Sequence, residues 1–160
     1  MREPVRQGRW TAEIEGDFVV FLINARINPW RVVRSVRDLG GNSMRKMLDY
    51  LVEHPEKGLL GYQLHGPFSV IVQYWRSFDH LEAFARDKDD PHLEVWRNYW
   101  KRVGKSGRTG IWHETFLVRA GEYETIYGNM PPTGLGKAGR LVTVAEAKGA
   151  RQRVGAAVDT

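Results

Sequence analysis

The sequence predicts an α+β fold of ferredoxin-like type, in which a four-stranded antiparallel sheet carries helices on one face. Three observations support this expectation. Strand-like and helix-like segments follow one another in the order strand, helix, two strands, helix, strand. The strand-like runs are apolar on both faces, and a Gly-Pro pair separates two of them as in a hairpin. A chain of 160 residues, 42% of them hydrophobic, has room for one sizeable core.

The first half of the chain supplies a strand, a helix and a hairpin. Residues 18–24 are a continuous β-branched and aromatic run, which is typical of a central strand. Apolar residues then recur at helical spacing from Met44 to Val52, behind a cap at Asn42-Ser43, and Pro55 ends that helix. The hairpin strands cover residues 58–65 and 67–75.

The second half supplies two helical segments and two strands. Ser77 or Asp79 caps the first helix, and Asp90 followed by Pro91 begins the second. Strands are expected at residues 110–118 and 121–127. The helix after Pro91 places an inward stripe at helical spacing, made of His92, Val95, Trp96, Tyr99 and Val103.

The chain divides into a domain and a tail. Residues 1–131 form the predicted domain with a short N-terminal arm, and residues 132–160, rich in glycine, alanine and basic residues, form a C-terminal tail. The segment from Gly134 to Gly139 matches a dinucleotide-binding pattern by letter. It follows two prolines instead of a strand, so we interpret it as a turn or an arm.

The strand at residues 110–118 carries an adjacent histidine and glutamate. His113 shares one face with Ile111 and Leu117, while Glu114 shares the other with Trp112, and both faces are expected to be buried. An ionisable group on a buried strand needs a partner or a function. His113, His92 and Glu114 are therefore the candidate catalytic residues, although a hydrogen-bonded core role for both histidines stays open.

Composition excludes several classes of protein. The chain has no cysteine, so disulfides, thiolate nucleophiles and cysteine-bound metals are excluded. The net charge of +5 comes from scattered residues and a basic tail, which argues against nucleic acid. No segment is long and apolar enough for a signal peptide or a membrane span, so we expect a cytoplasmic protein with no membrane partner.

The aromatic residues are dense enough to wall a pocket for a flat, apolar small molecule between sheet and helices. A polar residue, Asn98, would help to orient it. The histidines lack the spacing of a local zinc site. The candidate pocket residues are Tyr74, Trp75, Trp96, Asn98, Tyr99 and Trp112.

Two stretches carry a resemblance to known proteins. Residues 73–86, followed by Asp90-Pro91-His92, resemble the dimeric α+β barrel superfamily, as in antibiotic-biosynthesis monooxygenases. More narrowly, residues 111–116, 123–131 and 134–136 resemble an uncharacterised bacterial family of monooxygenase-like proteins. This narrower resemblance covers residues 8 to 140. Because the strands are apolar on both faces and helices cover only one, we expect a homodimer in which a second copy packs on the uncovered face of the sheet.

The resemblance implies two kinds of chemistry. Cofactor-free monooxygenases of the superfamily oxidise electron-rich aromatic substrates with dioxygen. Other members, including haem-degrading enzymes, peroxidase-like proteins and aldoxime dehydratases, bind haem through a histidine, and His92 is the position that matches by analogy. A small-molecule oxidoreductase is the first hypothesis, a haem enzyme with His92 as axial ligand the second, and a non-catalytic ligand-binding dimer the third.

Overall fold

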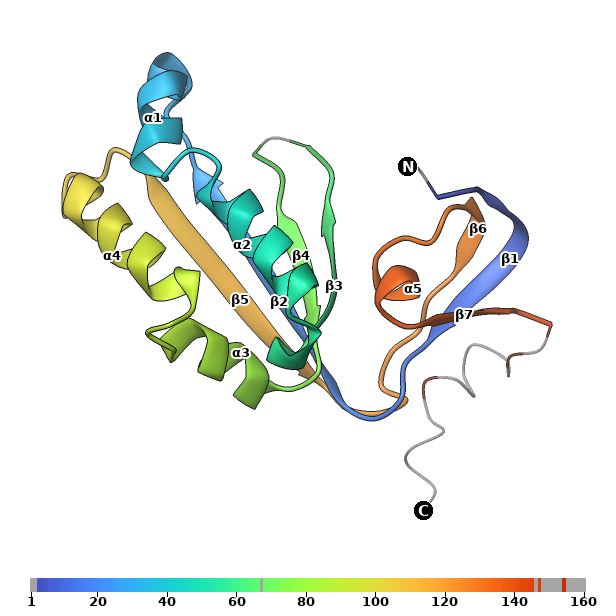
Figure 1. The fold of residues 1–160 in the computed structure, drawn as a ribbon. Helices are drawn as coiled ribbons and strands as arrows, with labels where there is room; N and C mark the ends of the chain where they lie inside the picture. The colour runs from blue at the N-terminus through green and yellow to red at the C-terminus, as the bar shows by residue number, and fades with distance from the viewer. Residues whose placement is uncertain (1–2, 67, 146, 148–153, 155–160) are drawn as a thin grey trace.

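The computed structural model describes residues 3–66, 68–145, 147 and 154, and it contains two antiparallel sheets (Figure 1). The larger sheet has four strands in the order β3-β4-β2-β5. Together with the helices this is the predicted α+β, ferredoxin-like arrangement, which is confirmed. Its strands are β2 (Phe18–Arg26), β3 (Leu59–Leu64), β4 (Ile71–Trp75) and β5 (Gly110–Val118).

Helices cover one face of the larger sheet (Figure 1). The predicted capping by Ser77 is confirmed, because its Oγ accepts a hydrogen bond from the His80 amide at 3.3 Å. Apolar residues of sheet and helices meet in a buried core of Val19, Leu51, Trp75, Leu81 and Phe84. The helices are α2 (Ser43–Glu53), α3 (Phe78–Arg86) and α4 (Pro91–Val103).

Three short helical elements were not predicted. A 3-10 turn η1 (Pro29–Arg31) leads into α1 (Val32–Asp38), and a second turn η2 (Pro55–Lys57) follows α2. The α1 segment lacks the apolar periodicity of α2, and only Ser35 and Asp38 of it are buried. Periodicity could not reveal a helix that contributes so little to the core.

A second, three-stranded sheet in the order β6-β1-β7 corrects the expected chain ends. The N-terminal arm is strand β1, the strand expected at residues 121–127 begins only at Tyr127, and residues 135–143 are helix and strand instead of loose tail. The new elements are β1 (Arg6–Glu13), β6 (Tyr127–Met130), α5 (Leu135–Ala138) and β7 (Arg140–Thr143).

This second sheet packs on part of the face of the larger sheet that the helices leave open, and the Trp112 and Phe116 end of that face stays exposed. Phe18, only 2% exposed, joins Ala12 of β1 and Leu135 of α5 in a second buried cluster. The sequence of β1 carries few apolar residues, and their burial depends on partners far away in the chain. Local patterns therefore gave no sign of it.

Strand β5 lies at an edge of the larger sheet, which corrects the expectation that both its faces are buried. Its residues are exposed or half-buried, and the side chains of Trp112 and Phe116 are 40% and 49% exposed to solvent. An edge strand has a neighbour on one side only, so alternation of apolar residues overstates its burial. Among the described residues, no helix is long and apolar enough to cross a membrane.

Candidate functional site

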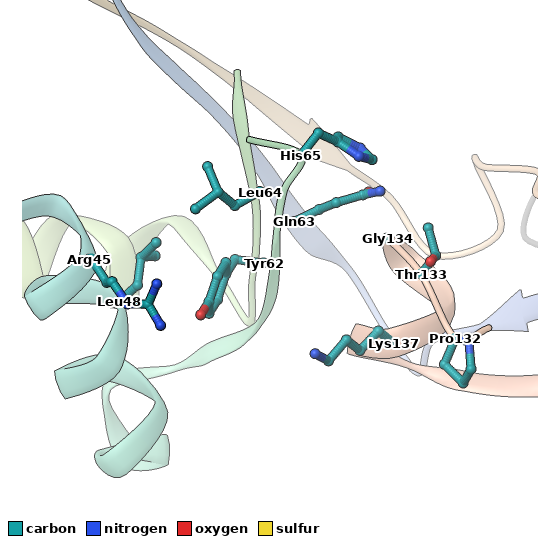
Figure 2. A pocket seen from close by; sticks show the side chains of 10 residues that line it. All are labelled: Arg45, Leu48, Tyr62, Gln63, Leu64, His65, Pro132, Thr133, Gly134 and Lys137. Atoms are coloured by element: carbon teal, nitrogen blue, oxygen red, sulfur yellow. The ribbon is translucent and has the colours of Figure 1, made fainter. Parts of the chain in front are cut away.

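A hollow of about 400 Å³ opens beside the edge strand β3, and we call it the β3 cleft (Figure 2). It is bounded by α2, by β3 and by the segment that leads into α5. These three walls come from distant parts of the chain. The lining residues are Arg45, Leu48, Tyr62, Gln63, Leu64, His65, Pro132, Thr133, Gly134 and Lys137.

Strand alternation decides which side chains of β3 face each wall. Tyr62 pairs with Gln73 and Leu64 with Ile71, both of which belong to the helix-covered face. Tyr62 and Leu64 therefore point towards α2, while Gln63 and His65 point towards the segment of residues 132–137, as Figure 2 shows. The cleft thus wraps both sides of a strand whose outer edge has no neighbouring strand in the described chain.

Gly134 closes one wall because no larger residue fits there. It has φ of 56°, and a Cβ would lie 3.0 Å from Gln63 Oε1 and 3.1 Å from Tyr74 Oη. Behind this turn, the Gly136 amide donates to Tyr127 Oη at 2.9 Å. Burial raises the pKa of Tyr74 and Tyr127, so both phenols stay neutral and anchor the turn through hydrogen bonds.

The charged groups of the β3 cleft are all basic. Arg45 makes one long contact with Asp49 at 3.9 Å, and both side chains are largely exposed. Lys137 makes no ion pair within the part of the chain that the structure describes. With Tyr62 and Leu64 as apolar surface, the cleft suits a small organic molecule that carries an anionic or oxygen-rich end.

The predicted catalytic residues lie outside this cleft. His113 is exposed and its ring stacks on Phe21 with centroids 5.2 Å apart, while Glu114 is exposed on the opposite face of β5. His92 is half-buried, and its Nδ1 lies 3.1 Å from the Ala85 carbonyl oxygen. The structure does not bring these residues together.

The predicted pocket residues are also scattered. Trp75 is a core residue, 1% exposed, and its Nε1 donates to Gln73 Oε1. Asn98 lies on the surface of α4, and Trp112 lies on the open face of β5. Tyr74 alone reaches the wall of the β3 cleft. The remaining two belong to an aromatic cluster on α4 made of Trp96, Tyr99 and Trp100.

Sequence reasoning missed most of the cleft. The polar side chains of Gln63 and His65 alternate with Tyr62 and Leu64, and that alternation was the available signal. No sequence signal pointed to Arg45 or Lys137, because they line the cleft from segments that are remote in sequence from β3 and from each other.

His92 is the side chain that would hold haem in the second hypothesis. The contact of His92 Nδ1 with a backbone carbonyl leaves Nε2 free, which is how an axial histidine is oriented. Its ring packs against Phe84 with centroids 5.8 Å apart, and His92 is not among the residues that line the β3 cleft. Among the described residues, no cluster of three histidine or acidic side chains could hold a metal ion.

The fold is shared with solved enzymes. Two crystal structures of aldoxime dehydratase, one of them in complex with butyraldoxime, superpose with TM-scores of 0.65 and 0.64 at 19% identity. Each match covers 86% of this chain and 42% of the other. At this identity the likeness shows the fold alone.

Sequence comparison identifies the family. The chain is 29% identical over 154 residues to "Monooxygenase af470" of Aspergillus fumigatus, a match that covers 83% of this chain and 54% of that protein. The chain therefore spans about half the length of this curated relative. The Monooxygenase af470-like family model matches residues 18–135, and the chain belongs to this family.

Proposed function

We propose that the chain acts as a small-molecule oxidoreductase of monooxygenase type and that its substrate binds in the β3 cleft. One observation supports this most directly: a single hollow of about 400 Å³ combines apolar walls with three basic side chains. That volume matches a small, largely apolar ligand. The family to which the chain belongs is named for a monooxygenase.

Within the proposal each lining group has a role. His65 acts as general base, since an imidazole can exchange a proton near neutral pH. Arg45 and Lys137 hold the resulting oxyanion from opposite walls. Tyr62 and Leu64 pack against the apolar or aromatic body of the substrate.

The proposed substrate is a phenol or enol with an acidic C–H₂ group, and dioxygen is the oxidant. His65 removes the proton, and the carbanion equivalent reduces dioxygen. Overall, the CH₂ group becomes a carbonyl: one oxygen atom enters the substrate, and the other leaves as water with both hydrogens. This four-electron oxidation balances without a further reductant.

A second candidate position for the same chemistry is His113, one of the three catalytic residues expected from the sequence. The stacking of His113 on Phe21 gives that imidazole a fixed, accessible position on β5.

We also propose that the chain forms a homodimer. Trp112 and Phe116 share the face of β5 that points away from the helices, and both keep 40% or more of their surface. An apolar sheet face of this kind is stabilised by a second sheet. Sedimentation at micromolar concentration tests this proposal, and a well-folded monomer would contradict it.

Oxygen uptake tests the catalytic proposal. The purified chain is mixed with a panel of phenols and 1,3-dicarbonyl compounds, and products are identified by mass spectrometry after reaction with isotopically labelled dioxygen. His65→Ala is expected to lower turnover by about 100-fold or more, as for loss of a general base. The matched control is His54→Ala, because His54 lies at the end of α2 beside Glu56 and outside the cleft.

Other outcomes assign the function elsewhere. If His113→Ala or His92→Ala removes activity while His65→Ala does not, the reacting centre is on β5 or α4. If the chain binds panel compounds by calorimetry and Lys137→Met weakens that binding, yet no compound is oxidised, the cleft belongs to a non-catalytic ligand-binding protein.

A further inference from the structure

A second surface has properties that the proposed reaction does not use. Around η1 and α1, Trp30 is 92% exposed, Val33 is 85% exposed and Val32 is 39% exposed. A tryptophan with nearly its whole surface in water is unusual in a folded domain. These residues line a shallow hollow of about 480 Å³, which we call the Trp30 patch: Trp30, Arg31, Val32, Val33, Arg34 and Arg37.

The apolar side chains of the Trp30 patch do not hold the segment in place. Polar contacts do so instead: Asn28 Oδ1 accepts from the Trp30 amide at 3.0 Å, and Ser35 Oγ accepts from the Asn28 amide at 3.2 Å. The buried residues of α1 are Ser35 and Asp38. The fold therefore fixes this segment while leaving its tryptophan and valines pointing outwards.

The charge of the Trp30 patch is strongly positive and uncompensated. Arg31, Arg34 and Arg37 make no ion pair within the described part of the chain. The nearby carboxylate of Asp38 is bound by Arg108 Nε at 3.3 Å. Three guanidinium groups thus lie beside an exposed tryptophan, and no acidic side chain among the described residues forms an ion pair with them.

The patch lies at one end of the molecule. In Figure 1, α1 projects at the end of the larger sheet where the β3–β4 turn also lies. That turn carries Phe68, which is 53% exposed and has φ of 67°, a conformation that residues other than glycine rarely adopt. Exposed apolar groups from two separate segments therefore occur at the same end, where a broad surface can approach them.

We propose that this end of the chain binds the surface of an anionic lipid membrane, with Trp30 and Val33 in the headgroup region and the three arginines on lipid phosphates. Tryptophan at the interface beside basic residues is the pattern of peripheral membrane contacts. No membrane partner was expected from the sequence because it contains no segment that could span a bilayer, but a peripheral contact requires no such segment.

Charge and composition favour a membrane over other partners. A second copy placed on this patch by a two-fold axis would bring arginines against arginines, in a chain of net charge +5. Nucleic acid would satisfy the arginines. It would leave Val32 and Val33 without apolar partners, because nucleic acid recognition relies on phosphate contacts and stacking.

Vesicle co-sedimentation tests the proposal on the full chain. Vesicles of equal parts phosphatidylcholine and phosphatidylglycerol are compared with vesicles of phosphatidylcholine alone. Binding is expected to the anionic vesicles, to weaken with added salt, and to fall about five-fold for each arginine changed to glutamine. Trp30→Ala is expected to weaken it by about ten-fold or more, and Trp30→Phe by less.

The matched control removes the same charge elsewhere. Arg76, Arg86 and Arg119 are exposed near the opposite end of the larger sheet, so changing all three to glutamine should leave vesicle binding within about two-fold of the parent. An equal loss in this control would overturn the proposal, since net charge alone would then explain binding. Binding of single-stranded RNA but not vesicles, or self-association that depends on Trp30, would overturn it as well.

Discussion

Phe18 joins the two sheets, and its removal should separate them. The side chain is 2% exposed, lies in one cluster with Ala12 and Leu135, and meets Tyr123 edge to face with ring centroids 5.3 Å apart. Phe→Ala in a core costs about 3–5 kcal/mol. The aromatic pair adds about 0.5–1.5 kcal/mol, so Phe18→Ala belongs at the upper end of that range. That is a large share of the 5–15 kcal/mol typical of a domain.

Urea unfolding measures this loss, and hydrogen exchange locates it. Amides of Thr11 in β1 and Val142 in β7 should exchange faster in Phe18→Ala, with less change in α2, because the second sheet loses its contact with the larger one. The conservative Phe18→Leu should cost less than about 1.5 kcal/mol. A loss below about 1 kcal/mol for Phe18→Ala would refute the packing of the second sheet described here.

Three further predictions concern buried polar groups and a glycine. Asp90, 3% exposed, accepts from Lys57 Nζ and from Tyr50 Oη, so Asp90→Asn should cost about 1.5–3 kcal/mol in urea unfolding. The hydrogen bonds with Asp90 raise the pKa of Lys57 and of Tyr50 above their usual 10.5 and 10.0. The stabilisation is therefore fully present below the usual pKa values and is lost as pH rises through the raised pKa values of the folded chain. In Asp90→Asn, the free energy of unfolding should fall less steeply between neutral and alkaline pH. Thr109→Val should be neutral or stabilising by about 1 kcal/mol in thermal unfolding, because its buried Oγ1 has no hydrogen-bond partner among the described residues; clear destabilisation would contradict this. Gly136→Ala should lower the melting temperature, since a Cβ would lie 2.7 Å from a leucine Cδ2 of β7, and an unchanged value would show that this wall can move.

Elements with strong local signals were predictable from the sequence. The helices α3 and α4 follow from Ser77 and from Asp90-Pro91, which fix where each begins, although Asp90 serves as an ion-pair partner and makes no capping hydrogen bond. The central position of β2 follows from its continuous apolar run, and the structure pairs it with strands on both sides.

The rest depends on contacts that no local pattern encodes. Alternation in β5 is compatible with a buried or an edge strand, and the sheet order decides between them. In place of the strand expected before Tyr127, the side chain of Thr125 accepts a hydrogen bond from the Ala12 amide at 2.7 Å. The β3 cleft could not be predicted from local patterns either. Lys137 and Gln63 line the same hollow only because α5 packs on β3.

The ladder between β1 and β7 joins positions 11 and 142, almost the full described length apart. Contacts between residues so far apart in sequence form late in folding, because closing the long intervening chain costs conformational entropy. During synthesis on the ribosome, the nascent chain therefore holds Phe18 uncovered until residue 135 and its neighbours emerge. A truncated chain that ends before this point would expose the apolar surface around Phe18 and would be prone to aggregation and proteolysis. Expression of the folded protein therefore requires synthesis of the segment that contains α5 and β7.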